Sequence, residues 1–191
     1  GQAKHSAILE DYAFLCEGLL ELYQATFDPE WLTLAHELAE TMVDLFWDDE
    51  RGFFDTAHDH EVLVYRPQEK TDNAIPSGTS SAVAALARLA IYVDRPEWRS
   101  MAEKTLHLLT PAIQRYPSAF AYLACQYDFL TSPPYEIVLA GEVNRPDMLA
   151  LLEVVNDNYR PNQVVAFSPS DSSIPDFPLF LGRAPVEGRA T

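Results

Sequence analysis

Cysteine, glycine and positive charge are all scarce in this sequence of 191 residues. The two cysteines, Cys16 and Cys125, lie far apart in apolar helical patterns without C-x-x-C spacing, which argues against a zinc or redox motif. We expect both to be core thiols. Only 13 Lys and Arg stand against 29 Asp and Glu, and the formal net charge is −16. Such a surface repels phosphates, so we expect neither nucleic acid nor a membrane as partner.

Long apolar runs and common catalytic motifs are also missing. Apolar runs such as residues 81–93 are too short to cross a bilayer, and the first residues do not resemble a signal peptide, which predicts a cytoplasmic location. The sequence has no G-x-S-x-G elbow, no G-x-x-x-x-G-K-[ST] loop and no H-E-x-x-H helix. These absences weigh against common hydrolase and nucleotidase functions.

A tripeptide repeat is the most informative feature that is present. Pro29-Glu30-Trp31 recurs as Pro96-Glu97-Trp98, at an offset of 67 residues. The same offset aligns apolar residues on both sides of the tripeptide: Leu19 with Leu86, Leu22 with Leu89 and Ala35 with Ala102. The repeat therefore predicts two equivalent helical hairpins.

Apolar periodicity predicts five helices, at residues 8–25, 30–46, 80–93, 97–114 and 118–130. The first, third and fifth are apolar on most sides, whereas the second and fourth carry one apolar stripe. This alternation is what an inner ring of helices inside an outer ring requires. The predicted fold is therefore mainly α, as part of an α/α toroid.

Short β-type segments interrupt this pattern. Residues 52–55 and 62–65 predict a β-hairpin around the polar turn 56–61. After a helix-breaking Ser-Pro-Pro, residues 136–140, 146–159 and 163–167 predict a β-α-β segment. We therefore divide the chain into a helical sector, residues 1–132, and a small α/β segment with a loop-rich tail, residues 133–191.

Candidate site residues gather where the inner helices begin. The repeat offset places Glu10 on Ser77 and Asp11 on Gly78, and residues 116–120 open the fifth helix in the same orientation. Glu10 and Asp11 could serve as a general acid and base. Alternatively, acidic residues in a first turn stabilise the helix dipole.

The segment 72–80 collects polar groups just before a buried helix. Asp72 is the third candidate catalytic carboxylate, with Asn73, Ser77 and Gly78 as candidate ligand-binding residues; the alternative is a well-capped helix start. Arg66 could bind a carboxylate or phosphate, or pair with a nearby acidic side chain.

Aromatic side chains could line the same end and stack on a sugar ring, although core packing is their commoner use. They are Tyr12, Phe53, Phe54, Tyr65 and Phe120, and Asp55 completes the candidate ligand-binding set. His58-Asp59-His60, flanked by Asp55 and Glu61, has some metal-ligand character, but alternate residues in a turn are usually solvated. We expect no metal and no cofactor.

Several of these segments, in order along nearly the whole chain, resemble the YyaL-like family. They are residues 9–14, 52–55, Arg66-Pro67, 72–80, Tyr116-Pro117 and Ala119-Phe120. Thr79 stands where the family commonly has Asn in a P-S-G-N-S stretch, which weakens any role for that side chain.

The resemblance implies a long protein with a thioredoxin-like domain followed by a six-hairpin α/α toroid, similar to N-acylglucosamine 2-epimerases and six-hairpin glycosidases. This chain looks like about two and a half hairpins from the C-terminal part. The resemblance thus implies part of a cavity for a small, sugar-type ligand, with the remaining toroid and the thioredoxin-like domain as partners. The alternative is a non-catalytic scaffold or docking module for that domain.

Overall fold

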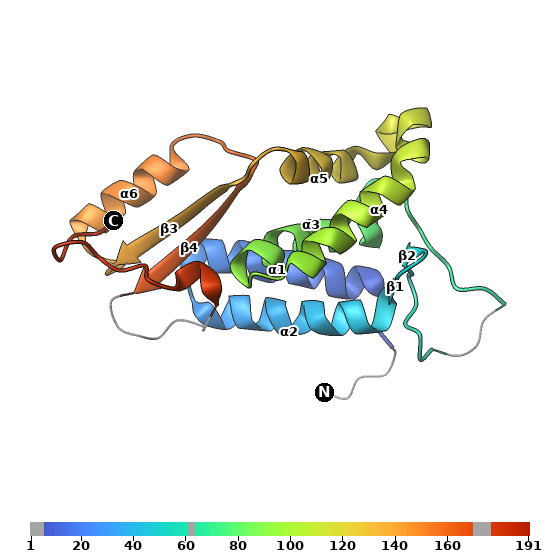
Figure 1. The fold of residues 1–191 in the computed structure, drawn as a ribbon, viewed down its shortest axis with the longest axis horizontal. Helices are drawn as coiled ribbons and strands as arrows, with labels where there is room; N and C mark the ends of the chain where they lie inside the picture. The colour runs from blue at the N-terminus through green and yellow to red at the C-terminus, as the bar shows by residue number, and fades with distance from the viewer. Residues whose placement is uncertain (1–5, 61–63, 170–176) are drawn as a thin grey trace.

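The computed structural model describes residues 6–60, 64–169 and 177–191 and is mainly helical (Figure 1). Helices α1 (Leu9–Thr26) and α2 (Pro29–Phe46) form one hairpin, and α3 (Gly78–Tyr92) and α4 (Pro96–Arg115) form a second. A 3₁₀ turn, η1 (Pro117–Phe120), leads into α5 (Ala121–Thr131). The mainly α fold and all five expected helices are confirmed.

The two hairpins share their turn geometry, as the repeat predicts. Phe27 and Asp94, which the offset of 67 residues aligns, both adopt left-handed backbone angles, with φ of 57° and 51°. Pro29 and Pro96 then occupy the first helical position, where a missing N–H costs nothing. The two turns are therefore equivalent.

Helix α3 lies between α1 and α5 and is buried on nearly every side. Helices α2 and α4 pack outside this row and bury one face each, as expected. For α1 the expectation of burial on most sides is wrong. It buries the stripe through Leu9, Ala13 and Leu20, while Leu15 is 56% exposed, because no described element covers its other apolar face.

Helix α5 is also less enclosed than its composition suggests. It buries Leu123, Gln126, Phe129 and Leu130, but it exposes Cys125. The prediction of two core thiols is therefore right for Cys16, whose pKa burial raises to about 12, and wrong for Cys125. Apolar surface is therefore exposed on α1 and on α5, the two helices that flank α3.

The predicted β-hairpin has a different partner. Strand β2 (Gly52–Phe53) pairs antiparallel with β1 (Trp47–Asp48), directly after α2. Val64 and Tyr65 are exposed and lie outside any strand, and residues 61–63 fall outside the described part of the chain. A tight turn after α2 offers a partner nearer in sequence than residues 62–65, which explains the error.

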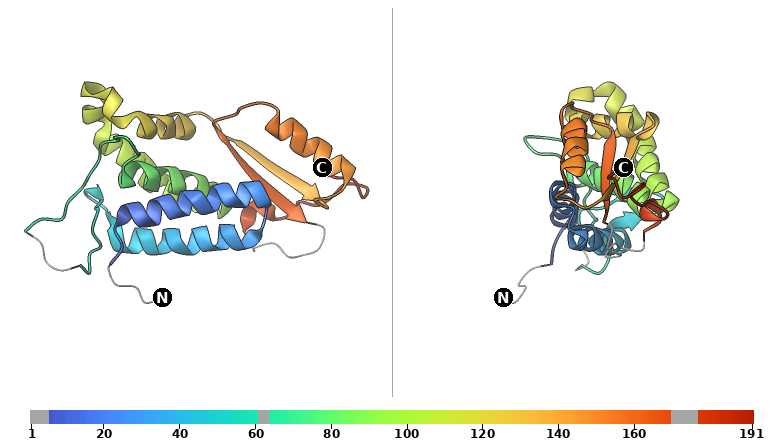
Figure 2. Two further views of the ribbon diagram at one scale, coloured as in Figure 1. Left: turned by 180° about the vertical axis from the view of Figure 1, so that it is seen from behind. Right: turned by 90° about the vertical axis from the view of Figure 1, so that its left-hand side faces the viewer.

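The β-α-β segment is confirmed. Strands β3 (Tyr135–Gly141) and β4 (Gln163–Pro169) are parallel and are joined through α6 (Pro146–Asn156), at the opposite end of the helices from β1 and β2 (Figures 1 and 2). A second 3₁₀ turn, η2 (Pro178–Phe180), follows β4. Val164 and Ala166 of β4 belong to the same apolar core as the helices.

Side chains of the helices close the outer edge of β4. The Tyr92 hydroxyl donates to the Val165 carbonyl at 2.9 Å, and the Phe167 N–H donates to the Tyr23 hydroxyl at 3.2 Å. The Val165 N–H donates to Oε1 of Gln24 at 3.1 Å. These bonds satisfy backbone groups that an edge strand would otherwise leave open, and they fix β4 against α1 and α3.

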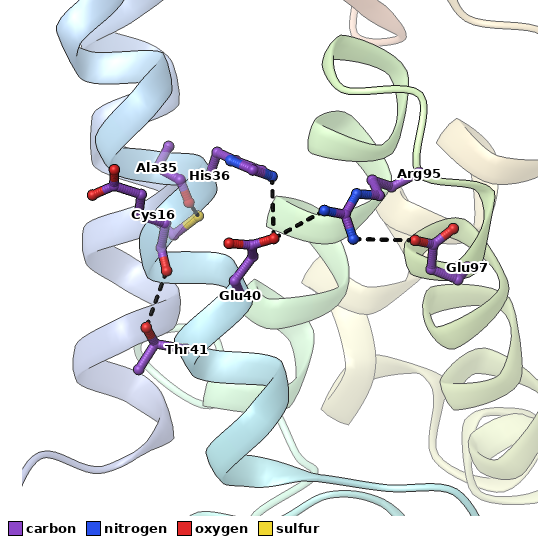
Figure 3. Close-up of polar contacts among 8 residues, drawn as sticks. Cys16, Ala35, His36, Glu40, Thr41, Arg95 and Glu97 are labelled. Atoms are coloured by element: carbon purple, nitrogen blue, oxygen red, sulfur yellow. Dashed lines mark hydrogen bonds and ion pairs between the residues drawn. The ribbon is translucent and has the colours of Figure 1, made fainter. Parts of the chain in front are cut away.

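A network of ion pairs joins α2 to the start of α4 (Figure 3). Arg95, just before α4, contacts Glu40 of α2 at 2.9 Å and Glu97 at 3.3 Å, and Nε2 of His36 lies 3.6 Å from the same Glu40 carboxylate. Trp98 packs on the His36 ring, with centroids 5.5 Å apart. Because the charges are largely exposed, the buried indole contributes more stability than the ion pairs.

Within residues 6–60, 64–169 and 177–191, no helix is long and apolar enough to cross a lipid bilayer.

Candidate functional site

We call α1, α3 and α5 the inner helices. Their N-terminal ends lie together at one end of the molecule, where we expected the candidate site from the sequence. Gly78 opens α3 directly against the first turn of α1. A Cβ at this position would lie 3.0 Å from Cγ and 3.1 Å from the backbone nitrogen of Glu10. Glycine therefore permits a helix contact that a larger residue would prevent.

Asp72 ties α3 to α5 through backbone donors. Its Oδ1 accepts from the Ser77 N–H at 3.0 Å, and its Oδ2 accepts from the N–H groups of Tyr122 and Leu123 at 2.8 and 3.2 Å. The Asp72 N–H donates to the Ala119 carbonyl at 2.8 Å. Asp72 thus caps the start of α5, whereas the capping alternative from the sequence concerned the start of α3.

Other polar candidates at this end also cap helices. Oδ2 of Asp11 accepts from the Ile8 N–H at 2.9 Å, and the Ser77 hydroxyl accepts from the Ser80 N–H at 3.1 Å. Asn73 is exposed. Glu10 is half-buried, and within the described part of the chain its carboxylate makes no hydrogen bond. Among these side chains, Glu10 remains available to a ligand.

The aromatic candidates are mostly core residues. Phe53, Phe54 and Phe120 are only 1%, 5% and 3% exposed. The half-buried Tyr12 packs on Phe46, with ring centroids 5.2 Å apart. The structure therefore brings these rings close to the helix starts without forming an open platform there.

Arg66 and Asp55 hold the segment after residue 64 against the helices. The Arg66 guanidinium lies 4.1 Å from the Phe54 ring centroid and donates to the carbonyls of Thr56 and Leu45 at 2.6 and 3.4 Å. Oδ2 of Asp55 accepts from the Glu69 N–H at 2.7 Å, and burial raises the pKa of this carboxyl. Arg66 thus bonds to backbone carbonyls.

A second polar cluster, which the sequence patterns did not indicate, crosses the row of inner helices. We call it the polar seam. Its residues lie one or two turns apart on each helix: Glu17, Glu21 and Gln24 on α1, Ser81 and Arg88 on α3, and Tyr122 and Gln126 on α5.

The centre of the polar seam is a contact between α1 and α5. The Tyr122 hydroxyl donates a hydrogen bond to Oε1 of Glu17, across the first turns of α3. Nη1 of Arg88 donates to Oε1 of Gln126 at 3.2 Å, and its guanidinium lies 5.1 Å from the Phe129 ring centroid. The polar seam therefore joins side chains of all three inner helices.

Burial perturbs the two central groups of the polar seam. Desolvation raises the pKa of Glu17, although the Tyr122 hydroxyl and the Arg88 charge oppose the shift. Desolvation and the neighbouring Glu17 also raise the pKa of Tyr122. The Ser81 hydroxyl is buried beside them and also opposes the shift of Glu17. A carboxyl that retains its proton to higher pH is suited to general acid catalysis.

A cavity of about 500 Å³ continues the polar seam at the C-terminal ends of α1 and α3. Glu21, Gln24 and Arg88 form its helical wall, and α6, β4 and the loop between them form the other wall. This volume lies within the usual range for a small-molecule site. Polar residues within otherwise apolar helices, such as Glu17 and Arg88, were the sequence signal for this region.

Comparisons with known proteins give relatives of the whole chain. No family model matches it. Spermatogenesis-associated protein 20 of mouse is 31% identical over 188 residues, which cover 96% of this chain and 24% of the relative. The human protein of the same name is 31% identical over 180 residues, covering 91% of this chain and 23% of the relative. The chain thus spans about a quarter of the length of these relatives.

This similarity runs through both helical hairpins and the β-α-β segment, since it covers 96% of the chain. It agrees with the motifs at the helix starts and confirms the resemblance that they indicated. The chain belongs to the family of spermatogenesis-associated protein 20.

Proposed function

We propose that this chain is one sector of an α/α toroid and that its polar seam forms part of the wall of a cavity that binds or processes a sugar-type small molecule. The observation that carries the proposal is the half-buried Glu17–Tyr122 contact beside Arg88, where α1, α3 and α5 meet. A toroid of this kind has a central space toward which one face of its inner helices turns.

The chemistry of the polar seam fits such a ligand. Carboxyl, hydroxyl, amide and guanidinium groups together offer both donors and acceptors to sugar hydroxyls. Glu17 supplies a proton donor at raised pKa, which is what protonation of a leaving oxygen requires. The Tyr122 hydroxyl orients that carboxyl. Glu10 is a further candidate carboxylate at the helix starts.

Sugar binding to the full-length protein tests the proposal. Neutral mono- and disaccharides are titrated and observed by ligand-detected NMR. Glu17→Gln and Tyr122→Phe should each weaken binding about fivefold or more while circular dichroism stays unchanged, because each removes one charged or hydrogen-bonding group. Glu37→Gln, on the exposed face of α2, is the matched control. Unchanged binding in both seam variants would remove the polar seam from the site.

The second candidate function is a scaffold for the thioredoxin-like domain that the family resemblance implies. The apolar stripe of α1 favours it, because Ile8 and Leu22 are 38% exposed on the same side as Leu15. If no sugar binds, and redox activity of the full-length protein follows only the thiols of that domain, the scaffold function stands. A cytoplasmic location belongs to both proposals.

A further inference from the structure

We propose that the cavity at the C-terminal ends of α1 and α3 binds a hydroxylated monocarboxylate, such as a uronic acid, with its carboxylate held by Arg88 and Arg160. This inference rests on the proposed sugar-type site and narrows its ligand to an acidic class. It depends on the charge, the free donors and the acceptors of the cavity wall.

Two arginines line the cavity against a single carboxylate. Arg88 on α3 and Arg160 on the loop before β4 both line the cavity, where Glu21 is the only acidic lining residue. Within the described residues, neither guanidinium has a carboxylate oxygen within 4.0 Å, whereas Arg95, Arg99 and Arg145 are ion-paired. The wall of the cavity therefore carries a local positive charge against a net charge of −16.

Each guanidinium keeps one side free. Arg88 uses Nη1 to donate to the Ala84 carbonyl and to Gln126, and Arg160 uses Nη1 to donate to the carbonyls of Val155 and Asn158. Nε and Nη2 of both residues make no hydrogen bond to the described residues. This edge presents two parallel N–H groups, which is the geometry that a carboxylate accepts in a bidentate pair.

The rest of the wall suits hydroxyl groups. Oε1 of Gln163 is buried and has no hydrogen-bond partner among the described residues, so it can accept a hydrogen bond from a ligand hydroxyl. The cavity also lies where α1 and α6 end, and helix C-termini present carbonyl acceptors and a partial negative charge. The aromatic residues Phe27 and Tyr159 also line the cavity. The helix C-termini and Glu21 offset part of the charge of the two guanidinium groups, so a singly charged carboxylate with hydroxyl groups fits better than a doubly charged phosphate.

Binding of D-glucuronate to the full-length protein, compared with D-glucose and glucose 6-phosphate, tests this inference. We expect glucuronate to bind about tenfold or more tightly than glucose, because a bidentate charged pair is added. Arg160→Gln should remove that preference and leave glucose binding within about twofold. Arg160→Lys keeps the charge but loses the fork, so its loss should be intermediate. Arg115→Gln, on α4, is the matched control and should change nothing.

The outcomes separate this inference from the proposed function. If the wild-type protein binds glucose and glucuronate equally well, the carboxylate site is overturned but the sugar-type site is not. Tighter binding of glucose 6-phosphate overturns the monocarboxylate class in favour of a phosphate. Binding of none of the three overturns both. If Arg160→Gln fails to fold, glucuronate binding is measured with Arg160→Lys and Arg88→Lys instead. Unchanged binding in both of these variants overturns the inference.

Discussion

Replacing Asp72 should destabilise the fold at the start of α5. Its carboxylate accepts three backbone N–H groups, at 3.0 Å from Ser77 and at 2.8 and 3.2 Å from Tyr122 and Leu123. Losing a helix cap costs about 0.5–2 kcal/mol, and a hydrogen bond to a charged acceptor contributes about 1.5–3 kcal/mol. Because the site is half-buried, water can replace part of these bonds. We therefore expect Asp72→Ala to lower the free energy of unfolding by about 2–4 kcal/mol.

Urea unfolding followed by tryptophan fluorescence measures this loss, with constant m-value as the check for two-state behaviour. Asp72→Asn keeps one acceptor oxygen and should lose about half as much as Asp72→Ala. Asp59→Ala, in an exposed turn, is the control. A change below about 0.5 kcal/mol in Asp72→Ala would refute the capping role and return Asp72 to the list of candidate catalytic residues.

Three further predictions concern the packing and charge of the same helices. Gly78→Ala should cost about 1–3 kcal/mol by thermal unfolding, because the new Cβ meets the backbone of α1; a neutral result would mean that the helices separate freely. Trp98→Ala should cost about 3–5 kcal/mol and Trp31→Ala clearly less, since only Trp98 is nearly fully buried; equal urea midpoints would contradict this. The pKa of Glu17 is raised by burial, so its contribution to stability is full below the unfolded pKa of about 4.5 and is lost as pH rises through the folded pKa. Glu17→Gln should therefore unfold at higher urea than the wild type at pH 8, with a flatter pH profile, and parallel profiles would contradict the shift.

Local sequence patterns were sufficient to predict the helices and their pairing into hairpins. The repeated Pro-Glu-Trp fixed two equivalent hairpins, and the matching left-handed residues Phe27 and Asp94 confirm that equivalence. The buried nature of α3 was also predictable, because Arg88 is its only charged residue. Periodicity and turn chemistry depend on neighbours along the chain, so a sequence reveals them directly.

Pairing and exposure were less predictable. The strand partner of residues 52–53 was assigned wrongly, because β-type patterns do not name their partners. The open faces of α1 and α5 depend on which elements lie beside them in space, and composition alone cannot give this. Asp72 was correctly placed at the helix starts, but its three bonds to backbone N–H groups depend on a loop that returns to α5.

The sequence by itself determined a helical repeat with polar residues clustered where its inner helices begin. Only the tertiary structure showed that Glu17 and Tyr122, which lie 105 residues apart, share a hydrogen bond. The chemical role of a single acidic or aromatic side chain in an apolar helix cannot be assigned until its neighbours are known. Burial and partners set the pKa of such a side chain, and both come from contacts between distant segments.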